Sequence, residues 1–249
     1  MNSPENKLTR IPQHIAFIMD GNGRWAKARG LSRSEGHLAG TQAVIEVVEN
    51  AFRRGVKFIT LYAFSSENWR RPQAEIDGLM RILLSFLAEQ EERFLKNEIR
   101  MRTIGDLSAF PQEVRDAISA IAEKTKNFPA RTVAIALNYG SRDEILRAAQ
   151  LYAKDVSDGN ADAETPSWET FSKYLYTAEM PDPDLVVRTS GEIRLSNFLL
   201  MQSAYAELYF TEKMWPDFDS AELDAALAFY ASRERRFGKT GEQLQNGGK

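Results

Sequence analysis

The sequence predicts an α/β protein in which a mostly parallel sheet of about six strands is covered by helices on both faces. Two observations lead to this prediction. Short runs of β-branched and aromatic residues alternate along the chain with longer segments whose apolar residues recur at helical spacing. The 249 residues, of which 43% are apolar, show no internal repeat and are enough for one large core, so we expect one domain over residues 1–249.

Five short segments are predicted to be strands, and the first two are expected to be buried because they are apolar runs that end in polar or glycine-containing residues. The segments are residues 15–19, 56–64, 99–104, 132–137 and 185–187. A further run that is rich in aromatic residues, 198–210, leads into the last helix.

Helices are predicted over residues 36–54, 74–97, 112–126, 141–153, 168–176 and 221–236. Gly55 is expected to stop the first helix, and Ser141 is expected to cap the fourth. The residues expected on the core face of the first helix are Leu38, Ile45, Val48 and Phe52. The helix over residues 74–97 is apolar on more than one face, which fits either a place between the sheet and a neighbouring helix or one wall of an apolar cavity.

The remaining segments are expected to be irregular. Residues 24–35 are basic and lack a helical pattern, and residues 154–167 are acidic and rich in small residues, as in an exposed loop. Residues 1–12 and 238–249 are polar, and we expect them to be flexible tails.

Composition excludes several classes of protein. The net charge of −3 gives no overall attraction to nucleic acid, so any anion must be bound by local arginines. The absence of cysteine excludes disulfides and thiolate chemistry. The beginning of the chain lacks the apolar core of a signal peptide, and no apolar cluster approaches the roughly 20 residues of a membrane span. We therefore expect a soluble, cytoplasmic protein.

Four segments follow predicted strands and are expected to converge, because ligands of such folds bind at the carboxyl ends of the strands. They are residues 20–24, 65–69, 138–140 and 188–192.

The first of these segments lacks the familiar phosphate-binding patterns. It has no third glycine of a dinucleotide fingerprint, no Walker A lysine, and at position 22 an asparagine instead of a second acid beside Asp20. What remains is a carboxylate that suits a divalent cation, followed by backbone amides and Arg24 that suit phosphate oxygens. An ordinary turn is the alternative.

Two further clusters suggest anion binding. Arg29, Arg33 and His37 lead into a predicted helix, and Arg33 and His37 would share a face if that helix began early. The segment over residues 188–197 contains two arginines and two serines, and guanidinium groups suit phosphate. Glu207 is an acid in an apolar stretch and is therefore expected to be either paired or a metal ligand. His14, at the start of a strand, is expected to be structural.

Four motifs, in order along the chain, resemble those of one enzyme family. They are HIAFIMDGNGRWAKARGLSR..GH (residues 14–37), LYAFSSENWRRP..E (61–75), ALNYGSRDEI (136–145) and PDLVVRTSGEIRLSNFLL.QSAYAELYF (183–210). On these residues the sequence resembles the cis-prenyltransferases, specifically the bacterial isoprenyl transferases of the undecaprenyl diphosphate synthase type. The resemblance implies a homodimer that uses Mg²⁺ to add isopentenyl diphosphate repeatedly to an allylic diphosphate, usually farnesyl diphosphate. It also implies cis double bonds, an apolar tunnel for the growing chain, and transient contact with a membrane surface when the long product is released.

The resemblance also implies roles for individual residues. Asp20 is expected to be the essential metal-binding acid, and Glu207 the second metal acid. Asn68 matches the residue often assigned as proton acceptor, although a carboxamide is not a base at neutral pH. The residues expected to bind the substrates are Gly21, Asn22, Gly23, Arg24, Trp25, Arg33, His37, Ser65, Ser66, Glu67, Trp69, Arg71, Arg188, Arg194, Leu195 and Ser196. Among them, residues 21–24 match the cradle of the allylic diphosphate, and Arg188, Arg194 and Ser196 match the isopentenyl diphosphate site.

Three positions depart from the family pattern without touching the acids or arginines. Ser190 replaces a frequent glycine, and Met201 stands where tryptophan is common. Ile193 occupies a variable position and excludes a metal contact from there. A non-catalytic prenyl-diphosphate-binding or scaffold subunit and a phosphohydrolase that uses Asp20 are the alternatives, and the complete set of acids and arginines favours the transferase.

Overall fold

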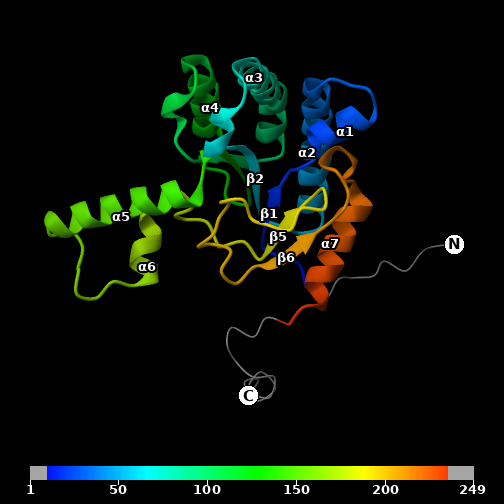
Figure 1. The fold of residues 1–249 in the computed structure, drawn as a ribbon. Helices are drawn as coiled ribbons and strands as arrows, with labels where there is room; N and C mark the ends of the chain where they lie inside the picture. The colour runs from blue at the N-terminus through cyan, green and yellow to red at the C-terminus, as the bar shows by residue number, and fades with distance from the viewer. Residues whose placement is uncertain (1–9, 235–249) are drawn as a thin grey trace.

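A sheet of six parallel strands forms the centre of the molecule (Figure 1). The structure is a computed structural model, and it describes residues 10–234. The strands lie in the order β3-β4-β2-β1-β5-β6. Their bounds are β1 His14–Ile18, β2 Phe58–Ser65, β3 Ile99–Ile104, β4 Arg131–Tyr139, β5 Leu185–Arg188 and β6 Glu207–Phe210. The predicted α/β class and the parallel sheet are confirmed.

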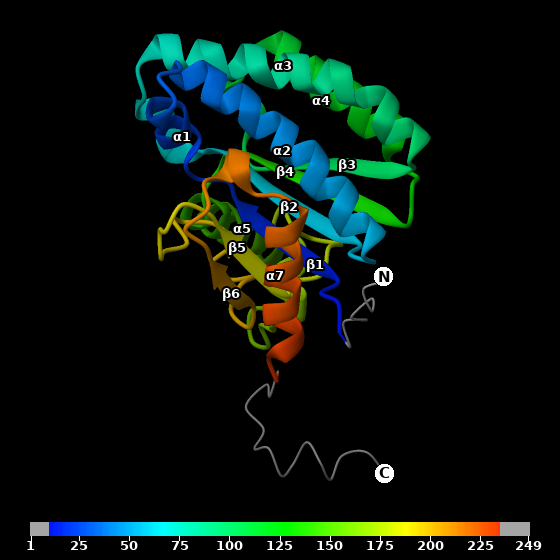
Figure 2. The ribbon, with the colours of Figure 1, turned by 90° about the vertical axis from the view of Figure 1, so that its right-hand side faces the viewer.

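Helices cover mainly one face of this sheet, whereas the sequence predicted helices on both faces. The α-helices within residues 10–234 are α1 Asn22–Ala28, α2 Arg33–Arg53, α3 Gln73–Lys96, α4 Gln112–Thr125, α5 Ser141–Ser157, α6 Trp168–Phe171 and α7 Ser220–Ser232. The larger apolar core lies between the sheet and α2, α3, α4 and α7 (Figure 2). The smaller core on the other face is closed by Phe198 and Leu199, from the non-helical segment before β6. Helices α5 and α6 lie to the side of the sheet, at the left of Figure 1.

The alternation of side chains along β1 shows why this strand is apolar throughout. Ile15 and Phe17 belong to the core under the helices, whereas Ala16 and Ile18 belong to the core on the other face. All four are at most 6% exposed. A parallel strand that is buried on both faces needs a continuous apolar run, and this is the pattern by which the strand was predicted.

The region between β1 and α2 differs from the prediction. Residues 24–35 were expected to be irregular, but α1 occupies the first part of them, and α2 begins at Arg33 because Ser32 and Glu35 form a capping box. Gly55 follows α2 with a φ of 97°, as expected for its stop. Leu38 is not on the core face of α2, since its side chain is 61% exposed.

The second half of the chain also differs in detail. Ser141 does not cap α5: the N-cap is Gly140, and α5 continues to Ser157, so the loop predicted over residues 154–167 begins later. Strand β6 lies within the aromatic-rich run and was not located by the sequence. The last helix, α7, ends at Ser232, earlier than the predicted end at residue 236. Most of the tail over residues 1–12 and all of the tail over 238–249 lie outside the described residues. None of the helices within residues 10–234 is long and apolar enough to cross a membrane.

The strand order places a crevice beside β1. This strand pairs with β2 on one side and with β5 on the other, so the connections that leave its carboxyl end diverge to the two halves of the sheet. Such a switch point is where open parallel sheets bind ligands. Asp20 follows β1 and Arg188 ends β5, so both residues lie at this crevice.

Candidate active site

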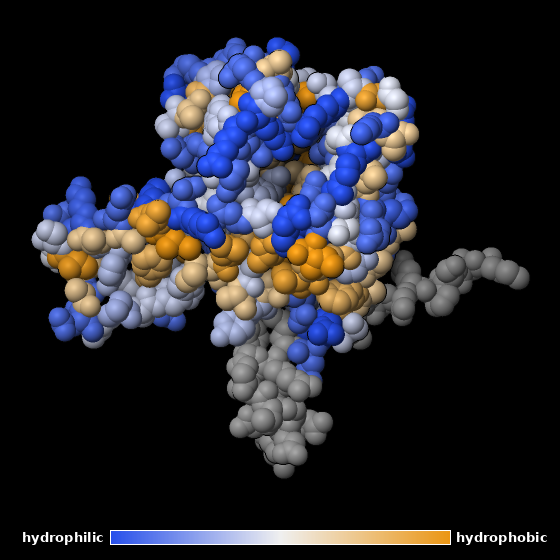
Figure 3. Space-filling view, in the orientation of Figure 1, coloured by the Kyte–Doolittle hydropathy of each residue, from blue (hydrophilic) through white to orange (hydrophobic). Residues whose placement is uncertain are grey.

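A cavity of about 370 Å³ opens at the carboxyl ends of β1, β2 and β5. Figure 3 shows the hollow between the parts of the surface that α2 and α3 form, with a hydrophilic rim. Its polar end is lined by Asp20, Asn22, His37, Ser65, Asn68, Arg71, Arg188 and Ser196. Its other end is lined mostly by apolar side chains of α3 and the strands, Leu79, Met80, Leu83, Phe86, Ile135 and Leu137 among them. The cavity therefore suits a ligand with an anionic head and an apolar tail.

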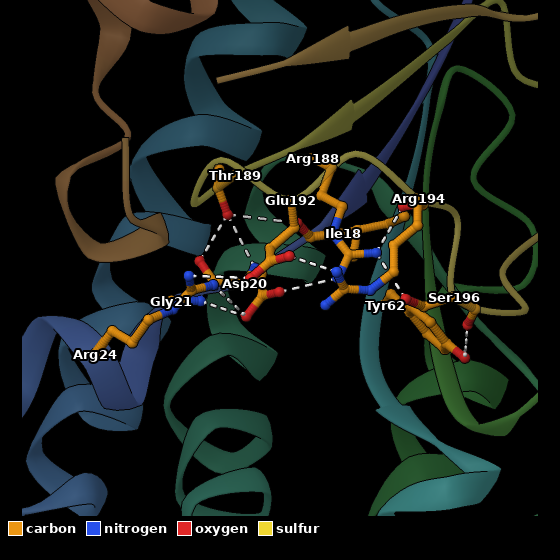
Figure 4. Close-up of polar contacts among 10 residues, drawn as sticks. All are labelled: Ile18, Asp20, Gly21, Arg24, Tyr62, Arg188, Thr189, Glu192, Arg194 and Ser196. Atoms are coloured by element: carbon orange, nitrogen blue, oxygen red, sulfur yellow. Dashed lines mark hydrogen bonds and ion pairs between the residues drawn. The ribbon is translucent and has the colours of Figure 1, made fainter. Parts of the chain in front are cut away.

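An ion pair between Asp20 and Arg188 forms the floor of the polar end (Figure 4). The Asp20 carboxylate accepts a hydrogen bond of 3.0 Å from Arg188 Nη2 and one of 2.7 Å from the Gly21 amide. Arg188 is only 3% exposed, and its guanidinium also donates to the Arg194 carbonyl at 2.6 Å and to Ser196 Oγ at 2.7 Å. One guanidinium thus joins the loop after β1 to the loop after β5.

Glu192 links two further arginines above this pair. Its carboxylate lies 3.1 Å from Arg24 Nη1 and accepts a hydrogen bond from Arg194 Nη1 (Figure 4). These contacts hold the pKa of Glu192 below its usual value, chiefly through the hydrogen bond from Arg194. Arg24 and Arg194 come from segments that were predicted to bind different diphosphates, and the structure brings them to one carboxylate.

A third acid pairs with the arginines at the α2 and α3 side of the cavity. Glu75 Oε1 accepts a hydrogen bond of 2.9 Å from Arg71 Nη1 and lies 3.1 Å from Arg33 Nε. His37 lies beside them, as predicted for a helix that starts early. Burial, and then the charges of Arg71 and Arg33, lower the pKa of His37 to about 4. At neutral pH this imidazole is therefore uncharged.

Three residues that line the cavity each have a buried polar atom with no hydrogen-bond partner within the described chain: Asn22 Oδ1, His37 Nε2 and Arg188 Nε. A fourth such atom, Ser190 Oγ, lies beside Gly21. Buried polar atoms are rarely left unsatisfied in folded proteins, and their gathering in one place indicates a site for a polar ligand.

Glycines allow α1 to approach α2 at the edge of the cavity. A Cβ on Gly36 would lie 2.2 Å from the Asn22 carbonyl oxygen, and a Cβ on Gly40 would lie 2.4 Å from Asn22 Oδ1. Gly21 has a φ of 102°, which other residues rarely adopt. Gly36 and Gly40 are one helical turn apart, and this spacing is a sequence signal for the close approach of another helix.

Ten of the sixteen residues predicted to bind substrate do not line the cavity. Four of these, Gly21, Arg24, Arg33 and Arg194, contact the acids described above, and the other six have different neighbours. The Trp25 indole donates a hydrogen bond of 2.7 Å to Asp217, and Trp69 packs against Phe64 and Phe110. Ser66 donates to Asp143, and Glu67 accepts from Asn197. Leu195 packs against the smaller core, and Gly23 lies beside the Arg33 side chain. Substrate contacts of these residues stay predictions.

Glu207 does not meet Asp20 within one chain. Glu207 is the first residue of β6 and pairs with Leu185 of β5, which in turn pairs with Ile15 near the start of β1. Asp20 lies beyond the opposite end of β1. Its carboxylate accepts a hydrogen bond of 3.2 Å from Arg233 Nε. The sequence left open whether Glu207 is paired or a metal ligand, and within the described chain it is paired.

Metal binding at the cavity would depend on Asp20. No group of three or more acids and histidines that could hold a metal ion occurs within residues 10–234. Mg²⁺ is commonly bound through one or two carboxylates together with substrate phosphates, and Asp20, with its side chain 32% exposed, supplies such a hard oxygen ligand. The residues present therefore fit an ion that binds together with a diphosphate.

Tyr62 was not predicted as part of the site, although it lines the cavity. Its ring stacks on Phe198 with a centroid separation of 4.4 Å, and its hydroxyl donates to the Ser196 carbonyl at 3.3 Å. Burial raises the pKa of Tyr62. The hydroxyl therefore remains protonated at neutral pH and supports the loop that carries Ser196.

Comparisons with known proteins agree with this geometry. The family model described as "Putative undecaprenyl diphosphate synthase" matches residues 18–238. An isoprenyl transferase of Clostridium perfringens is 47% identical over 229 residues, which are 92% of this chain and 90% of that protein. A ditrans,polycis-undecaprenyl-diphosphate synthase of Acinetobacter baylyi, described as specific for (2E,6E)-farnesyl diphosphate, is 46% identical over 95% of both chains.

A solved structure shares the fold. The lavandulyl diphosphate synthase of Lavandula x intermedia, in complex with dimethylallyl diphosphate, superimposes with a TM-score of 0.89 at 37% identity and covers 94% of this chain and 100% of its own. Together with the cavity and its acids and arginines, these matches show that the chain belongs to the undecaprenyl diphosphate synthase family of prenyltransferases.

Proposed function

We propose that this protein condenses isopentenyl diphosphate repeatedly onto an allylic diphosphate, farnesyl diphosphate in the first instance, with cis stereochemistry. The product is a long-chain polyprenyl diphosphate such as undecaprenyl diphosphate, the precursor of the cell-wall lipid carrier. The observation that carries the proposal is the meeting of two cationic clusters, one after β1 and one after β5, over one cavity with an apolar end.

The allylic diphosphate binds at the loop after β1, where Asn22 and Arg24 supply polar contacts, with Arg33, His37 and Arg71 beside them. The isopentenyl diphosphate binds at Arg188, Arg194 and Ser196. In this arrangement Glu192 and Glu75 hold the arginines in place before the substrates arrive. Each diphosphate then competes with a carboxylate for its arginines, and its higher charge favours the exchange.

The reaction breaks the allylic carbon–oxygen bond while the double bond of isopentenyl diphosphate attacks the same carbon. Negative charge develops on the departing diphosphate, and Arg24 and the neighbouring polar groups stabilise it more in the transition state than before reaction. Mg²⁺, held by Asp20 and diphosphate oxygens, would supply further neutralisation of this charge. The apolar end of the cavity excludes water from the carbocation-like fragment.

The proton lost from isopentenyl diphosphate needs an acceptor. Asn68 lines the cavity, but its Oδ1 accepts a hydrogen bond of 3.2 Å from the Ser65 amide, and a carboxamide is not a base at neutral pH. We assign Asn68 a positioning role, and the departing diphosphate takes the proton.

The apolar end of the cavity serves as the entrance of a tunnel for the growing chain. A second cavity of about 40 Å³ lies beyond it and shares the wall residues Val44, Leu61 and Phe86. Helix α3 supplies most of the apolar side chains on the helical side, in keeping with the cavity-wall alternative for this segment.

A homodimer is supported by the surface around β6. This strand is at the edge of the sheet, and large apolar side chains on it and on the preceding segment are exposed: Leu200 38%, Met201 40%, Tyr205 68% and Leu208 38%. Burial of such a patch against a second copy would remove it from water. Met201→Glu together with Tyr205→Lys should then reduce the mass measured by light scattering from dimer to monomer.

The protein acts in the cytoplasm, in transient contact with the inner surface of the membrane, where the long apolar product is released. The net charge of −3 gives no basis for nucleic acid as a partner.

The activity is tested by incubating the purified chain with farnesyl diphosphate, labelled isopentenyl diphosphate and Mg²⁺. Label should enter material that organic solvent extracts, and Asp20→Ala should abolish its incorporation. Absence of incorporation by folded wild-type protein would refute the proposal. Phosphate release without isopentenyl diphosphate would instead favour a phosphohydrolase.

A further inference from the structure

Asn197 lies at the junction of three segments of the chain. Its backbone oxygen accepts a hydrogen bond of 2.8 Å from the Ser141 amide, and its side-chain Oδ1 accepts one of 3.0 Å from the Arg142 amide. Its side-chain Nδ2 donates one of 3.0 Å to Glu67 Oε1. Gly140, the N-cap residue of α5, has no side chain that could bond the first amides of this helix, so Asn197 satisfies them instead. Asn197 also binds the segment that follows β2.

The chemistry of its partners fixes the orientation of the Asn197 amide. The Arg142 backbone N–H can only donate, and the Glu67 carboxylate can only accept, so oxygen must face α5 and nitrogen must face Glu67. The backbone of Asn197 is left-handed, with a φ of 64°, a conformation that asparagine tolerates better than most residues. A Cβ on Gly140 would lie 2.6 Å from Asn197 Nδ2, so the junction also needs a glycine there.

The residues next to Asn197 belong to the isopentenyl diphosphate site proposed above. Ser196 and Arg194 are bound on one side by the Arg188 guanidinium, and Asn197 anchors the same loop on the other side. Glu67 adjoins Asn68, which lines the cavity at the allylic side. The side chain of Asn197 is thus a short connection between the two halves of the site.

We propose that Asn197 is a positioning residue that couples the isopentenyl diphosphate subsite, through Glu67, to the segment over residues 65–68. This inference rests on the proposed function. Two substrates must be held in register for each condensation, and a misplacement of about 1 Å can cost on the order of 100-fold in rate. The bond to Glu67 holds the loop that carries Ser196 against the segment that carries Asn68.

Burial alone would raise the pKa of Glu67, but hydrogen bonds, first among them that from Asn197, lower it overall. Glu67 is therefore charged at neutral pH. In Asn197→Asp the new carboxylate can still accept from the Arg142 amide, but it faces the Glu67 carboxylate across the broken bond. In Asn197→Asp with Glu67→Gln the bond is restored with donor and acceptor exchanged.

The kinetic test compares wild type, Asn197→Asp, Glu67→Gln and the double variant, with Asn160→Asp on the exposed loop as the matched control. Asn197→Asp should lower kcat/KM by about 10–100-fold, with a raised KM for isopentenyl diphosphate, whereas the control should be unchanged. Glu67→Gln should raise kcat/KM when it is added to Asn197→Asp, whatever it does alone. A double variant no more active than Asn197→Asp would overturn the proposal, and so would wild-type kinetics of Asn197→Asp.

Hydrogen exchange of the same variants provides a readout that needs no activity. Asn197→Asp should exchange faster over residues 65–68, by about tenfold or more, while residues 141–142 stay protected. The double variant should restore protection of residues 65–68. Unchanged exchange there would overturn the coupling. An inactive wild type that showed the expected exchange pattern would refute the proposed function and leave the coupling supported.

Discussion

Asp20 and Arg188, 168 residues apart in sequence, form an ion pair of 3.0 Å at the carboxyl ends of two neighbouring strands, β1 and β5. Arg188 is 3% exposed, and within residues 10–234 its guanidinium has no other carboxylate among its hydrogen-bond partners. Because the register of β1 and β5 brings their carboxyl ends together, the pair joins the two diphosphate sites proposed here.

Loss of the Asp20 charge should therefore affect both halves of the site. Asp20→Asn removes the hard ligand for the metal and leaves a buried arginine without its counter-ion. We expect incorporation of isopentenyl diphosphate to fall by about 100-fold or more. Steady-state kinetics at several Mg²⁺ concentrations check this, and Asp116→Asn, at an exposed position of α4 outside the cavity, is the control. Activity within a few-fold of wild type would contradict the assignment.

His14 should make stability depend on pH. It is 1% exposed, with one ring nitrogen 2.7 Å from the Pro181 carbonyl oxygen and the other 2.8 Å from Thr60 Oγ1, and burial lowers its pKa to about 4. The pKa of a histidine in the unfolded chain is near 6.5, so both states carry a neutral His14 above that pH and stability is not reduced there. As the pH falls from 6.5 towards 4, the unfolded chain takes up a proton that the folded chain does not, and the free energy of unfolding decreases. The free energy of unfolding should fall by about 3 kcal/mol over this pH range.

Urea unfolding at pH 7.5 and pH 4.5 measures this effect. The wild type should lose more stability between the two pH values than His14→Gln, which should already be less stable at pH 7.5. Equal losses in both proteins would show that His14 is not the cause.

Ser190 should be a position of backbone strain. It has a φ of 79°, it is 7% exposed, and its hydroxyl has no hydrogen-bond partner among the residues that the structure describes. Ser190→Gly removes both the strain of the positive φ and the unpaired buried hydroxyl. The free energy of unfolding should therefore rise by about 1 kcal/mol, after the greater entropy of a glycine in the unfolded chain is counted. Denaturant titration checks this. Ser190→Ala, which keeps the strain, should gain less, and a destabilised glycine variant would contradict the interpretation.

Phe86 should limit the length of the product, because it is part of the wall between the two cavities. Phe86→Ala removes most of that side chain and joins the cavities. The product distribution, measured by mass spectrometry, should move by at least one isoprene unit towards longer chains. Leu95→Ala, on the same helix but outside both cavities, is the matched control. An unchanged distribution in Phe86→Ala would place the limit elsewhere.

The sequence located five strands to within a few residues. Four of them contain continuous apolar runs that stand out from their flanks, whereas β3 is an edge strand in which Arg100 and Arg102 alternate with the buried residues Ile99 and Met101. Strand β6 was not located because it is a short edge strand whose residues are only partly buried. In such a strand neither a continuous run nor a clear alternation is visible.

The start of α2 is encoded by a capping motif, although the basic composition of the surrounding residues led to the prediction of an irregular segment. Ser32 and Glu35 have the spacing of a capping box, but the basic residues around them suggested an irregular segment. Helix α1 is only seven residues long. A helix that short depends on tertiary packing, here against Gly36 and Gly40, which local propensity does not report.

The site was predictable in part for a topological reason. The carboxyl ends of parallel strands meet at one edge, so the convergence of Asp20 and Arg188 follows from the strand pattern. The place of Glu207 does not follow, because it depends on the register of β6 against β5, and no motif encodes that register. The direction of the Trp25 side chain depends in the same way on Asp217, a distant partner.

Product mass spectrometry of the wild-type chain tests the central claim most directly. After incubation with farnesyl diphosphate, isopentenyl diphosphate and Mg²⁺, the dephosphorylated products should form a series spaced by one isoprene unit, and the series should be absent from Asp20→Ala. Recovery of farnesol alone, with isopentenyl diphosphate unconsumed by folded protein, would contradict the account.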